Sequence, residues 1–381
     1  MRPDAQTLYV VRAFSFYMSK KDEIKRLWAE SFGDSREFVE MYFDRVYRDA
    51  DAMTLMTDDG HVASALLLQP YGLSFHGLRA SASYVAGAAT KRNMRGKGLM
   101  TALMADTLME SRRRGDIITI LIPASSYLYG FYARMGFATV AFTDIMRYTA
   151  LHSFAHPEDS PFEEFTPVDD IFDRRVYDAM ARMEHRIDRT VVLHSHRDFL
   201  NILDDITLDG GTCVAISDSE RQIAAIAWGR PATDGSDTIR VDQMLYSSPT
   251  ARLAALRQLR MRWPGRPFAV MAPVDDNGRH ATPRGMARIV DAAKTLALIA
   301  STNPDIDLLV RVTDQLIESN NATYHLQRGE CREALADNIK GRTLDFDIDI
   351  TTLCELVFSS PSIGNITGLP AQRLDIALML D

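Results

Sequence analysis

The chain carries a short basic stretch with two glycines whose residue types suit the binding of a phosphate group. Arg95, Gly96, Lys97 and Gly98 stand between a predicted strand and an apolar helical pattern that starts at Leu99. Glycine has no side chain to keep a ligand from the backbone, and the first amides of a helix lack partners and carry partial positive charge. The stretch therefore predicts a phosphate cradle, although ordinary turns also use glycine.

The elements on both sides of this loop support that interpretation. Residues 99–108 repeat apolar side chains at helical spacing, and Gly115 ends the helix. Residues 117–122 are an unbroken apolar run, which is typical of a buried parallel strand. A second short helix follows and ends at Tyr132-Ala-Arg-Met-Gly136-Phe137. The expected order is strand, loop, helix, strand and helix.

This order resembles the GNAT acetyltransferase superfamily. Its acetyl-CoA loop follows the pattern Arg/Gln-x-x-Gly-x-Gly/Ala, and its later helix carries Tyr-x-x-x-Gly-Phe/Tyr; Arg95, Gly98 and Tyr132 fit these positions. Met100 departs from the last small position of the loop. That departure resembles one branch, the enhanced-intracellular-survival family, in which a large apolar residue occurs there.

The resemblance implies acetyl-CoA as co-substrate and no metal. Small residues on the strand before the loop would let the pantetheine arm bond to the backbone like an extra strand. A tight contact between a helix and the sheet explains the same small residues, and the two interpretations are compatible. The predicted cofactor contacts are Gly87, Ala88, Ala89, Arg95, Gly96, Lys97, Gly98, Leu99, Met100 and Ser125.

Two helices are predicted near the start of the chain, over residues 24–32 and 37–46, with a break at Gly33-Asp34-Ser35. In the superfamily such helices wall the acceptor pocket. Trp28, Phe32 and Phe38 are therefore predicted substrate contacts. Aromatic residues at helical spacing more often belong to the core, so that alternative stays open.

Two residues are candidates for proton transfer. By family resemblance, Tyr132 should protonate the departing thiolate; its alternative role is packing. In the survival family the terminal carboxylate reaches the active site, so Asp381 is the predicted base, with a plain surface terminus as the alternative. His76 has no neighbouring carboxylate in sequence and is read as a packing or surface residue.

The length of 381 residues predicts two or three domains of mixed α/β (α+β) class. Residues 1–150 would form the GNAT catalytic domain. After a linker rich in proline and acid, residues 151–278 predict a second GNAT-like domain, whose turn at Tyr246-Ser-Ser-Pro-Thr250 has no glycine or basic residue to hold a diphosphate.

Residues 279–381 resemble the sterol-carrier-like domain that closes survival-family proteins, and the resemblance directs the C-terminus to the active site. We expect a helix over 286–300 and a hairpin of strands at 308–313 and 323–327. Asp345, Asp347 and Asp349 alternate with apolar residues, which favours a solvated sheet face over a metal site.

Composition limits the function classes. The net charge is −8, with +3 on residues 1–150 and −11 on the rest, which suits an anionic cofactor and a cationic acceptor and argues against a nucleic-acid partner. No apolar run is long enough to span a membrane, and the first 17 residues lack the pattern of a secretion signal. With three scattered cysteines, the expected location is the cytoplasm.

These observations predict an N-acetyltransferase in which a primary amine, of a cationic small molecule or a lysine, attacks acetyl-CoA directly. Two alternatives stay open: a noncatalytic acyl-CoA-sensing protein, and a lipid-binding module based on the C-terminal domain. The resemblance also implies a homo-oligomer, with the hexamer of the survival family as the expected assembly.

Overall fold

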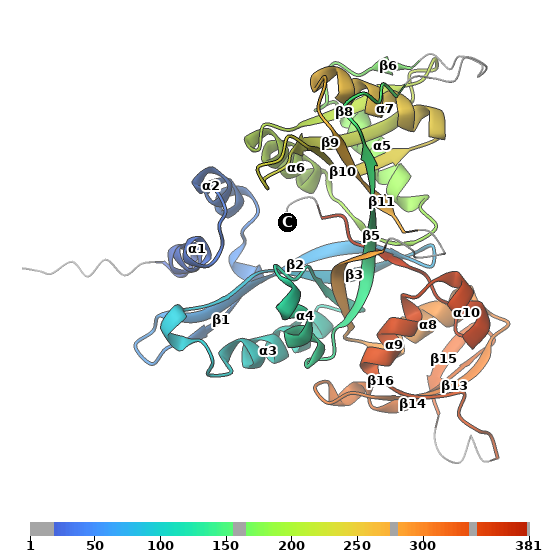
Figure 1. Cartoon of the computed structure of the whole chain (residues 1–381). Coiled ribbons are helices and arrows are strands. Elements are labelled where there is room, and N and C mark those ends of the chain that lie inside the picture. Colours follow the sequence, from blue (N-terminus) through green and yellow to red (C-terminus); the bar gives the residue numbers. More distant parts are fainter. Residues whose placement is uncertain (1–18, 155–164, 275–280, 335–340, 379–381) are drawn as a thin grey trace, which may run out of the picture.

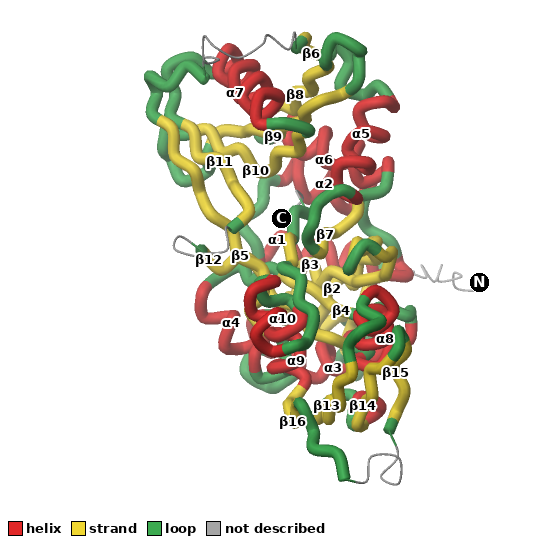
Figure 2. The backbone as a smooth tube through the Cα atoms, turned by 90° about the vertical axis from the view of Figure 1, so that its right-hand side faces the viewer, coloured by secondary structure: helices red, strands yellow, loops and turns green. Residues whose placement is uncertain are grey.

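Two mixed sheets and their helices make up the fold in a computed structural model of the chain, which describes residues 19–154, 165–274, 281–334 and 341–378. The larger sheet has 13 strands and the smaller has four. Parallel and antiparallel pairs occur in both, with helices packed on their faces (Figures 1 and 2). The predicted mixed α/β class is confirmed.

The N-terminal part follows the predicted order of elements. Ser35 caps the second helix and accepts a hydrogen bond from the amide of Phe38 at 3.1 Å. Its elements are α1 (Lys20–Ser31), α2 (Arg36–Arg45), η1 (Asp49–Asp51), β1 (Ala52–Met56), β2 (Val62–Phe75), β3 (Leu78–Thr90), η2 (Arg92–Met94), α3 (Leu99–Arg113), β4 (Ile118–Leu121), α4 (Ser126–Ala133) and β5 (Ala138–Tyr148).

Strands β3 and β4 run parallel and then separate, which opens the sheet. They pair only from Ala82, opposite Ile118, to Tyr84, opposite Ile120, although β3 continues to Thr90. On its other edge β3 carries a bulge, since two of its residues lie opposite one residue of β2 between the pairs Leu67–Ala86 and Ala65–Ala89. The carboxyl ends of the parallel strands therefore face a gap in the sheet.

The middle of the chain extends the same sheet. Strand β5 bridges the two halves, because it pairs with β12 along its first residues and with β11 along its last (Figure 1). The elements are β6 (Thr166–Pro167), α5 (Arg174–His185), β7 (Thr190–Leu193), α6 (His196–Leu208), β8 (Thr212–Ser217), β9 (Ile223–Pro231), β10 (Ile239–Tyr246), α7 (Pro249–Arg262) and β11 (Phe268–Pro273).

The C-terminal part contributes the small sheet and two further strands of the large one. The predicted hairpin of β13 and β14 is confirmed. Its elements are β12 (Thr282–Ile289), α8 (Ala292–Thr302), β13 (Asp307–Thr313), η3 (Glu318–Asn320), β14 (Ala322–Gln327), β15 (Glu330–Glu333), β16 (Phe346–Asp349), α9 (Ile350–Val357), α10 (Pro361–Thr367) and β17 (Leu374–Asp375).

The predicted helix over residues 286–300 was wrong in its first third. Residues 286–289 belong to β12, and the helix begins only at Ala292, after Asp291 caps it by accepting from the Lys294 amide at 3.0 Å. A short apolar run fits a buried strand as well as a helix. Here β12 pairs with β4 and with β5, and these two sets of backbone hydrogen bonds stabilise the strand over the helix.

The strands around the N-terminal part close into a ring. The path runs β12–β4–β3–β2–β7–β17–β5 and returns to β12 through the β12–β5 pairing. Strands from both later parts of the chain thus complete the sheet of the first. The domain boundaries at residues 150 and 278 remain predictions, and β12 and β17 pair with strands on the other side of the second boundary.

A buried ion pair joins the C-terminal part to the large sheet. Arg288 of β12 donates to Asp314 at 2.6 Å, and both side chains are 1% exposed. Arg288 also donates to the carbonyls of Met135 and Ile289, at 3.1 and 2.6 Å. Burial on its own raises the pKa of the Asp314 carboxyl, but Arg288 and the hydrogen bond from Asn320 outweigh it and lower that pKa.

The three alternating acids near β16 have structural partners. Asp345 accepts from the Leu309 amide at 2.7 Å, Asp347 pairs with Arg311, and Asp349 caps α9 by accepting from the Thr352 amide at 2.7 Å. Among the described residues no cluster of three or more His, Cys, Asp or Glu has the arrangement of a metal site. No described helix has the length and apolarity to cross a membrane.

We predict that Asp314→Ala lowers the free energy of unfolding by about 3–5 kcal/mol, because it leaves the Arg288 guanidinium buried without a counter-charge. Chemical unfolding at neutral pH measures this. Asp347→Ala, which breaks the exposed pair with Arg311, is the control and should cost at most about 1 kcal/mol.

The pH dependence of the stability difference between the wild type and Asp314→Ala tests whether the ionised Asp314 is its cause. Since the folded pKa of Asp314 is depressed, its stabilisation is present above the unfolded pKa of aspartate and is lost as pH falls through the folded pKa. The gap between the wild type and Asp314→Ala should therefore shrink in strong acid. Equal stability of Asp314→Ala and Asp347→Ala at neutral pH would contradict the assignment.

Candidate active site

A cavity of about 760 Å³ lies at the carboxyl ends of β3 and β4, where the two strands have separated. Parallel strands of open sheets commonly bind ligands at this end. The cavity collects most of the predicted cofactor contacts from four elements. Its lining includes Ala88, Ala89 and Thr90 of β3, Arg95, Gly96, Gly98, Leu99 and Met100 of the loop and α3, Ser125 before α4, and Tyr132.

The glycine loop has the geometry that an anion cradle requires. Gly96 and Gly98 have φ of +75° and +77°, which other residues rarely adopt, and a Cβ built on either meets no atom within 4 Å. No side chain caps α3, and the first amide of the helix with a backbone partner among the described residues is that of Ala102. The amides before it are free to bind a ligand.

The corresponding helix of the middle part is closed to such a ligand. Ser248 caps α7 by accepting from the Ala251 amide at 3.1 Å, and Pro249 stands at the first helical position without an N–H to offer. That the second copy holds no diphosphate remains a prediction. The contrast with the uncapped α3 shows that the free amides are particular to one of the two helices.

The cations of the loop differ in position. Arg95 lines the cavity, and its Nε donates to the carbonyl of Thr90 at 3.0 Å, so this side chain also fastens the loop to the end of β3. Lys97 is exposed and lies outside the lining. Its charge acts on an anion at longer range than the backbone amides do.

Tyr132 lies on the wall of the cavity formed by α4, and its side chain is largely buried. The rings of Phe131 and Phe137 pack edge-on against it, with centroids at 5.1 and 5.8 Å. Burial, with a smaller effect of Tyr127, raises the pKa of Tyr132 to about 12. The phenol therefore keeps its proton at neutral pH and is able to donate it.

Gly136, the glycine of the Tyr-x-x-x-Gly-Phe pattern, is required by two features of the turn after α4. Its φ is +81°, and a Cβ there would lie 2.7 Å from Nε of Arg288. Because Arg288 donates to the adjacent Met135 carbonyl, the buried ion pair holds this turn. The position of Tyr132 thus depends on a residue from the C-terminal part of the chain.

The predicted acceptor contacts are divided between the cavity and the core. Phe32 lines the cavity, whereas Trp28 and Phe38 lie outside the lining. Trp28 is 8% exposed, donates from Nε1 to Asp34 at 2.7 Å, and packs so closely on the bulge of β3 that a Cβ on Gly87 would meet its ring at 2.1 Å. Gly87 therefore makes room for Trp28.

His76 is not among the lining residues of this cavity. His76 sits in the turn between β2 and β3, and burial, opposed by Asp188, lowers its pKa to about 4, in agreement with a packing role. Asp381, the predicted base, lies outside the described residues. Leu378, which is 1% exposed, is the last residue that the structure describes.

Several lining residues were not predicted. Ser31, Thr101, Tyr127, Phe131 and Arg134 complete the walls. Tyr127 and Phe131 belong to α4, the helix that carries Tyr132, and Arg134 follows its last residue. The helical spacing of this segment was the signal that could have indicated them.

Residues 17–140 match the protein-family model described as an acetyltransferase (GNAT) domain. The matched segment runs from α1 into β5 and contains the glycine loop and Tyr132. This segment of the chain is therefore similar to a GNAT acetyltransferase domain. No curated protein sequence matches the chain.

Solved structures extend the likeness to nearly the whole chain. A probable N-acyltransferase from Enterococcus faecalis is 16% identical with a TM-score of 0.72, covering 93% of this chain and 96% of that one. A GCN5-related N-acetyltransferase from Anabaena variabilis is 18% identical with a TM-score of 0.67, covering 92% and 89%. Eis1 from Mycobacterium abscessus is 15% identical with a TM-score of 0.67, covering 92% and 90%. At these identities the likeness establishes a shared fold.

Gly98→Val should weaken acetyl-CoA binding at least about tenfold, or about 1.4 kcal/mol, because a branched side chain blocks access to the α3 amides and strains a positive φ. Calorimetric titration measures this. Gly60→Val is the matched control, since Gly60 has φ +79°, equally open surroundings and a place in the β1–β2 turn. Equal affinity of both folded variants would exclude the loop from the site.

Proposed function

We propose that the protein transfers the acetyl group of acetyl-CoA to a primary amine, which attacks the thioester directly. The observation that carries this proposal is that the uncapped start of α3 and the protonated Tyr132 face the same cavity. The start of α3 would hold an anion at one side of the cavity, and Tyr132 would supply a proton at another. The family match supports acyl-CoA as the donor.

The cavity fits the shape and charge of acetyl-CoA. The free amides at the start of α3 and the side chain of Arg95 suit the diphosphate. The bulged end of β3, with Ala88, Ala89 and Thr90 exposed to the cavity, offers backbone groups to the pantetheine arm. Gly87 serves this end indirectly, through the packing of Trp28.

Catalysis in this proposal depends on positioning and on one proton donor. Backbone groups fix the acetyl carbonyl, and the walls hold the amine in attack geometry. Tyr132 donates a hydrogen bond to the departing thiolate and passes it the proton as the thioester bond breaks. Since the ordinary thiol pKa near 8.5 lies below that of the buried phenol, this transfer is uphill, and the phenolate regains a proton from water.

Asp381 is our proposed base for the proton of the acceptor ammonium. Support comes from strand β17, which lies between β7 and β5, and from the burial of Ile376 and Leu378 at the centre of the molecule. The acceptor is proposed to be the primary amine of a small molecule or a lysine. A homo-oligomer, a hexamer by the family resemblance, and a cytoplasmic location remain predictions.

A noncatalytic acyl-CoA sensor is the second candidate, because the cavity by itself requires only binding. Release of free thiol from acetyl-CoA in the presence of a panel of primary amines distinguishes it from the enzyme. The lipid-binding alternative for the C-terminal part, and its sterol-carrier-like character, are tested by extraction of stoichiometric lipid from the purified protein.

Tyr132→Phe should retain acetyl-CoA affinity and lower the acetylation rate by about a hundredfold or more, the scale of losing a positioned acid. Steady-state rates and a parallel titration measure the two effects. Tyr127→Phe is the control, since Tyr127 lines the same cavity from the same helix but is 77% exposed. Wild-type turnover in Tyr132→Phe would leave that residue a packing role.

Adding several residues after Asp381, or removing the last four residues, should lower the rate at neutral pH with little change in acetyl-CoA affinity. The rate of the truncated enzyme should recover partly as pH rises, since an amine that is already deprotonated needs no base. Full activity of both variants at neutral pH would exclude the terminal carboxylate as the base.

A further inference from the structure

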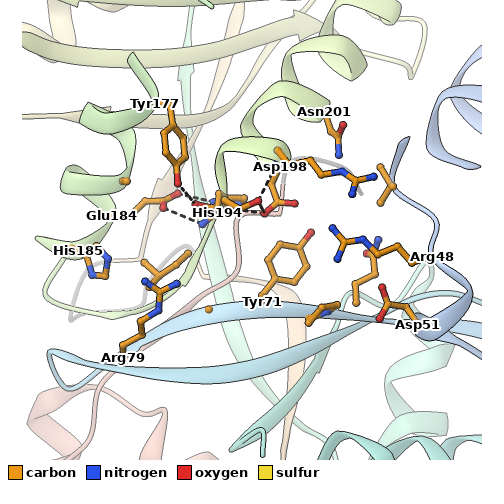
Figure 3. Close-up of a pocket in the computed structure, with 18 residues that line it drawn as sticks. Arg48, Asp51, Tyr71, Arg79, Tyr177, Glu184, His185, His194, Asp198 and Asn201 are labelled. Atoms are coloured by element: carbon orange, nitrogen blue, oxygen red, sulfur yellow. Dashed lines mark hydrogen bonds and ion pairs between the residues drawn. The ribbon is translucent and has the colours of Figure 1, made fainter. Parts of the chain in front are cut away.

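A second cavity, of about 380 Å³, lies between the N-terminal and middle parts of the chain and shares no lining residue with the first. Strand β2 forms its floor from Gln69 to Gly72. Helix α5 and the start of α6 form the opposite walls (Figure 3). The lining is rich in charged side chains of both signs, so its preference for a ligand depends on which charges are already engaged.

Each of the three acids in the lining has a partner within the protein. Asp51 pairs with Arg114 at 3.2 Å, and Arg114 is further fixed by the Leu68 and Ala50 carbonyls. Asp198 closes the capping box of α6 by accepting from the Ser195 amide at 2.7 Å. Glu184 accepts from the ring and the amide of His194, at 2.6 and 3.2 Å.

The arginines of the lining are less engaged than the acids. Within the described ranges, neither Arg48 nor Arg79 has an ion-pair or hydrogen-bond partner for its guanidinium, and both side chains are exposed. Arg197 donates to the carbonyl of Arg45, which leaves its charge uncompensated by a carboxylate. Figure 3 shows Arg48 and Arg79 on opposite sides of Tyr71, above the strand that forms the floor.

His194 and Glu184 form a buried pair in the lining of the cavity. Its side chain is 2% exposed, and its Nε2 has no hydrogen-bond partner among the described residues. Burial on its own lowers the pKa of His194, but the charge and hydrogen bond of Glu184 outweigh it, and the nearby Leu378 backbone also favours the protonated ring, so that the pKa is raised. A protonated His194 neutralises Glu184.

We propose that this cavity binds the anionic group, a carboxylate or a phosphate, of a small molecule. Arg48 and Arg79 would hold the anion from two sides, because guanidinium groups bind both anions with paired, charge-assisted hydrogen bonds. The internally paired acids leave the arginine charges for the ligand. A cationic ligand at Asp51 or Glu184 would instead have to compete with Arg114 or His194, and Asp198 is engaged by the neutral cap of α6.

The anion can come from two sources. An amine acceptor that also carries an acid would place its acid here, and this version rests on the proposed acetyl transfer. Phe32 of the first cavity packs against Trp28, which packs against Tyr42, with ring centroids at 5.3 and 4.7 Å, and none of these three residues lines the second cavity. A separate anionic effector would occupy the same arginines without reaching the thioester.

The direct test is a titration with inorganic phosphate at constant ionic strength, followed by calorimetry. We expect saturable binding that weakens at least about tenfold in the double variant Arg48→Gln, Arg79→Gln. Arg257→Gln is the control, since Arg257 is an exposed arginine on α7, outside the lining. Gly98→Val, in which the glycine loop is blocked, should keep this binding.

Absence of saturable binding, or equal binding in the double variant and the wild type, would overturn the proposal. Phosphate binding lost in Gly98→Val but kept in the double variant would also overturn it, because the phosphate would then sit on α3. The phosphate titration does not depend on acetyl transfer. If the protein transferred no acetyl group, the titration would still show whether the second cavity binds an anion.

Rates of thiol release then identify the source, with β-alanine and β-alaninamide as a matched pair of acceptors. If the acceptor supplies the anion, the wild type has a lower KM for β-alanine than for its amide, and this preference falls about tenfold in the double variant while kcat is kept. If a separate effector supplies the anion, added phosphate changes the wild-type rate with both acceptors. In the double variant, phosphate then changes the rate with neither acceptor.

Discussion

The buried pair of Arg288 and Asp314 constrains the part of the structure that the proposed chemistry depends on. Two charges that are each 1% exposed are stable only with each other and with additional hydrogen bonds, here to the Met135 and Ile289 carbonyls and from Asn320. The pair fixes β12 against the turn that follows α4. Only glycine fits at Gly136 beside Arg288, so this glycine of the Tyr-x-x-x-Gly-Phe pattern is required by a contact with a distant segment of the chain.

A second constraint is the divergence of β3 from β4, which produces the cofactor cavity. A bulge in β3, the packing of Trp28 on Gly87, and the pairing of β4 with β12 act together there. These contacts come from the first helix, the middle of the domain and the C-terminal part of the chain. The cavity therefore depends on the closed ring of strands, and the helices that line it add the free amides and the phenol.

The local features of the fold and site could be predicted from the sequence, and the remote pairings could not. The glycine loop follows from turn chemistry and from the helical spacing after it, which are local, and Tyr132 follows from the resemblance to a short family pattern. Strands β7 and β17 have only four and two residues and are defined by partners far along the chain. Trp28 was predicted as a substrate contact from the place of such helices in the superfamily, with core packing as the alternative. Its contact with Gly87 could not be predicted, because the two residues are remote in sequence.

The central claim is that the cavity at α3 is a catalytic site for acyl transfer to an amine. The most direct measurement follows thiol release from acetyl-CoA with a panel of primary amines and identifies the acetylated amine by mass spectrometry. The account predicts stoichiometric thiol and acetylated product with at least one amine, formed more slowly by about a hundredfold or more in Tyr132→Phe. A folded protein that binds acetyl-CoA and yields no acetylated amine with any member of the panel would contradict it.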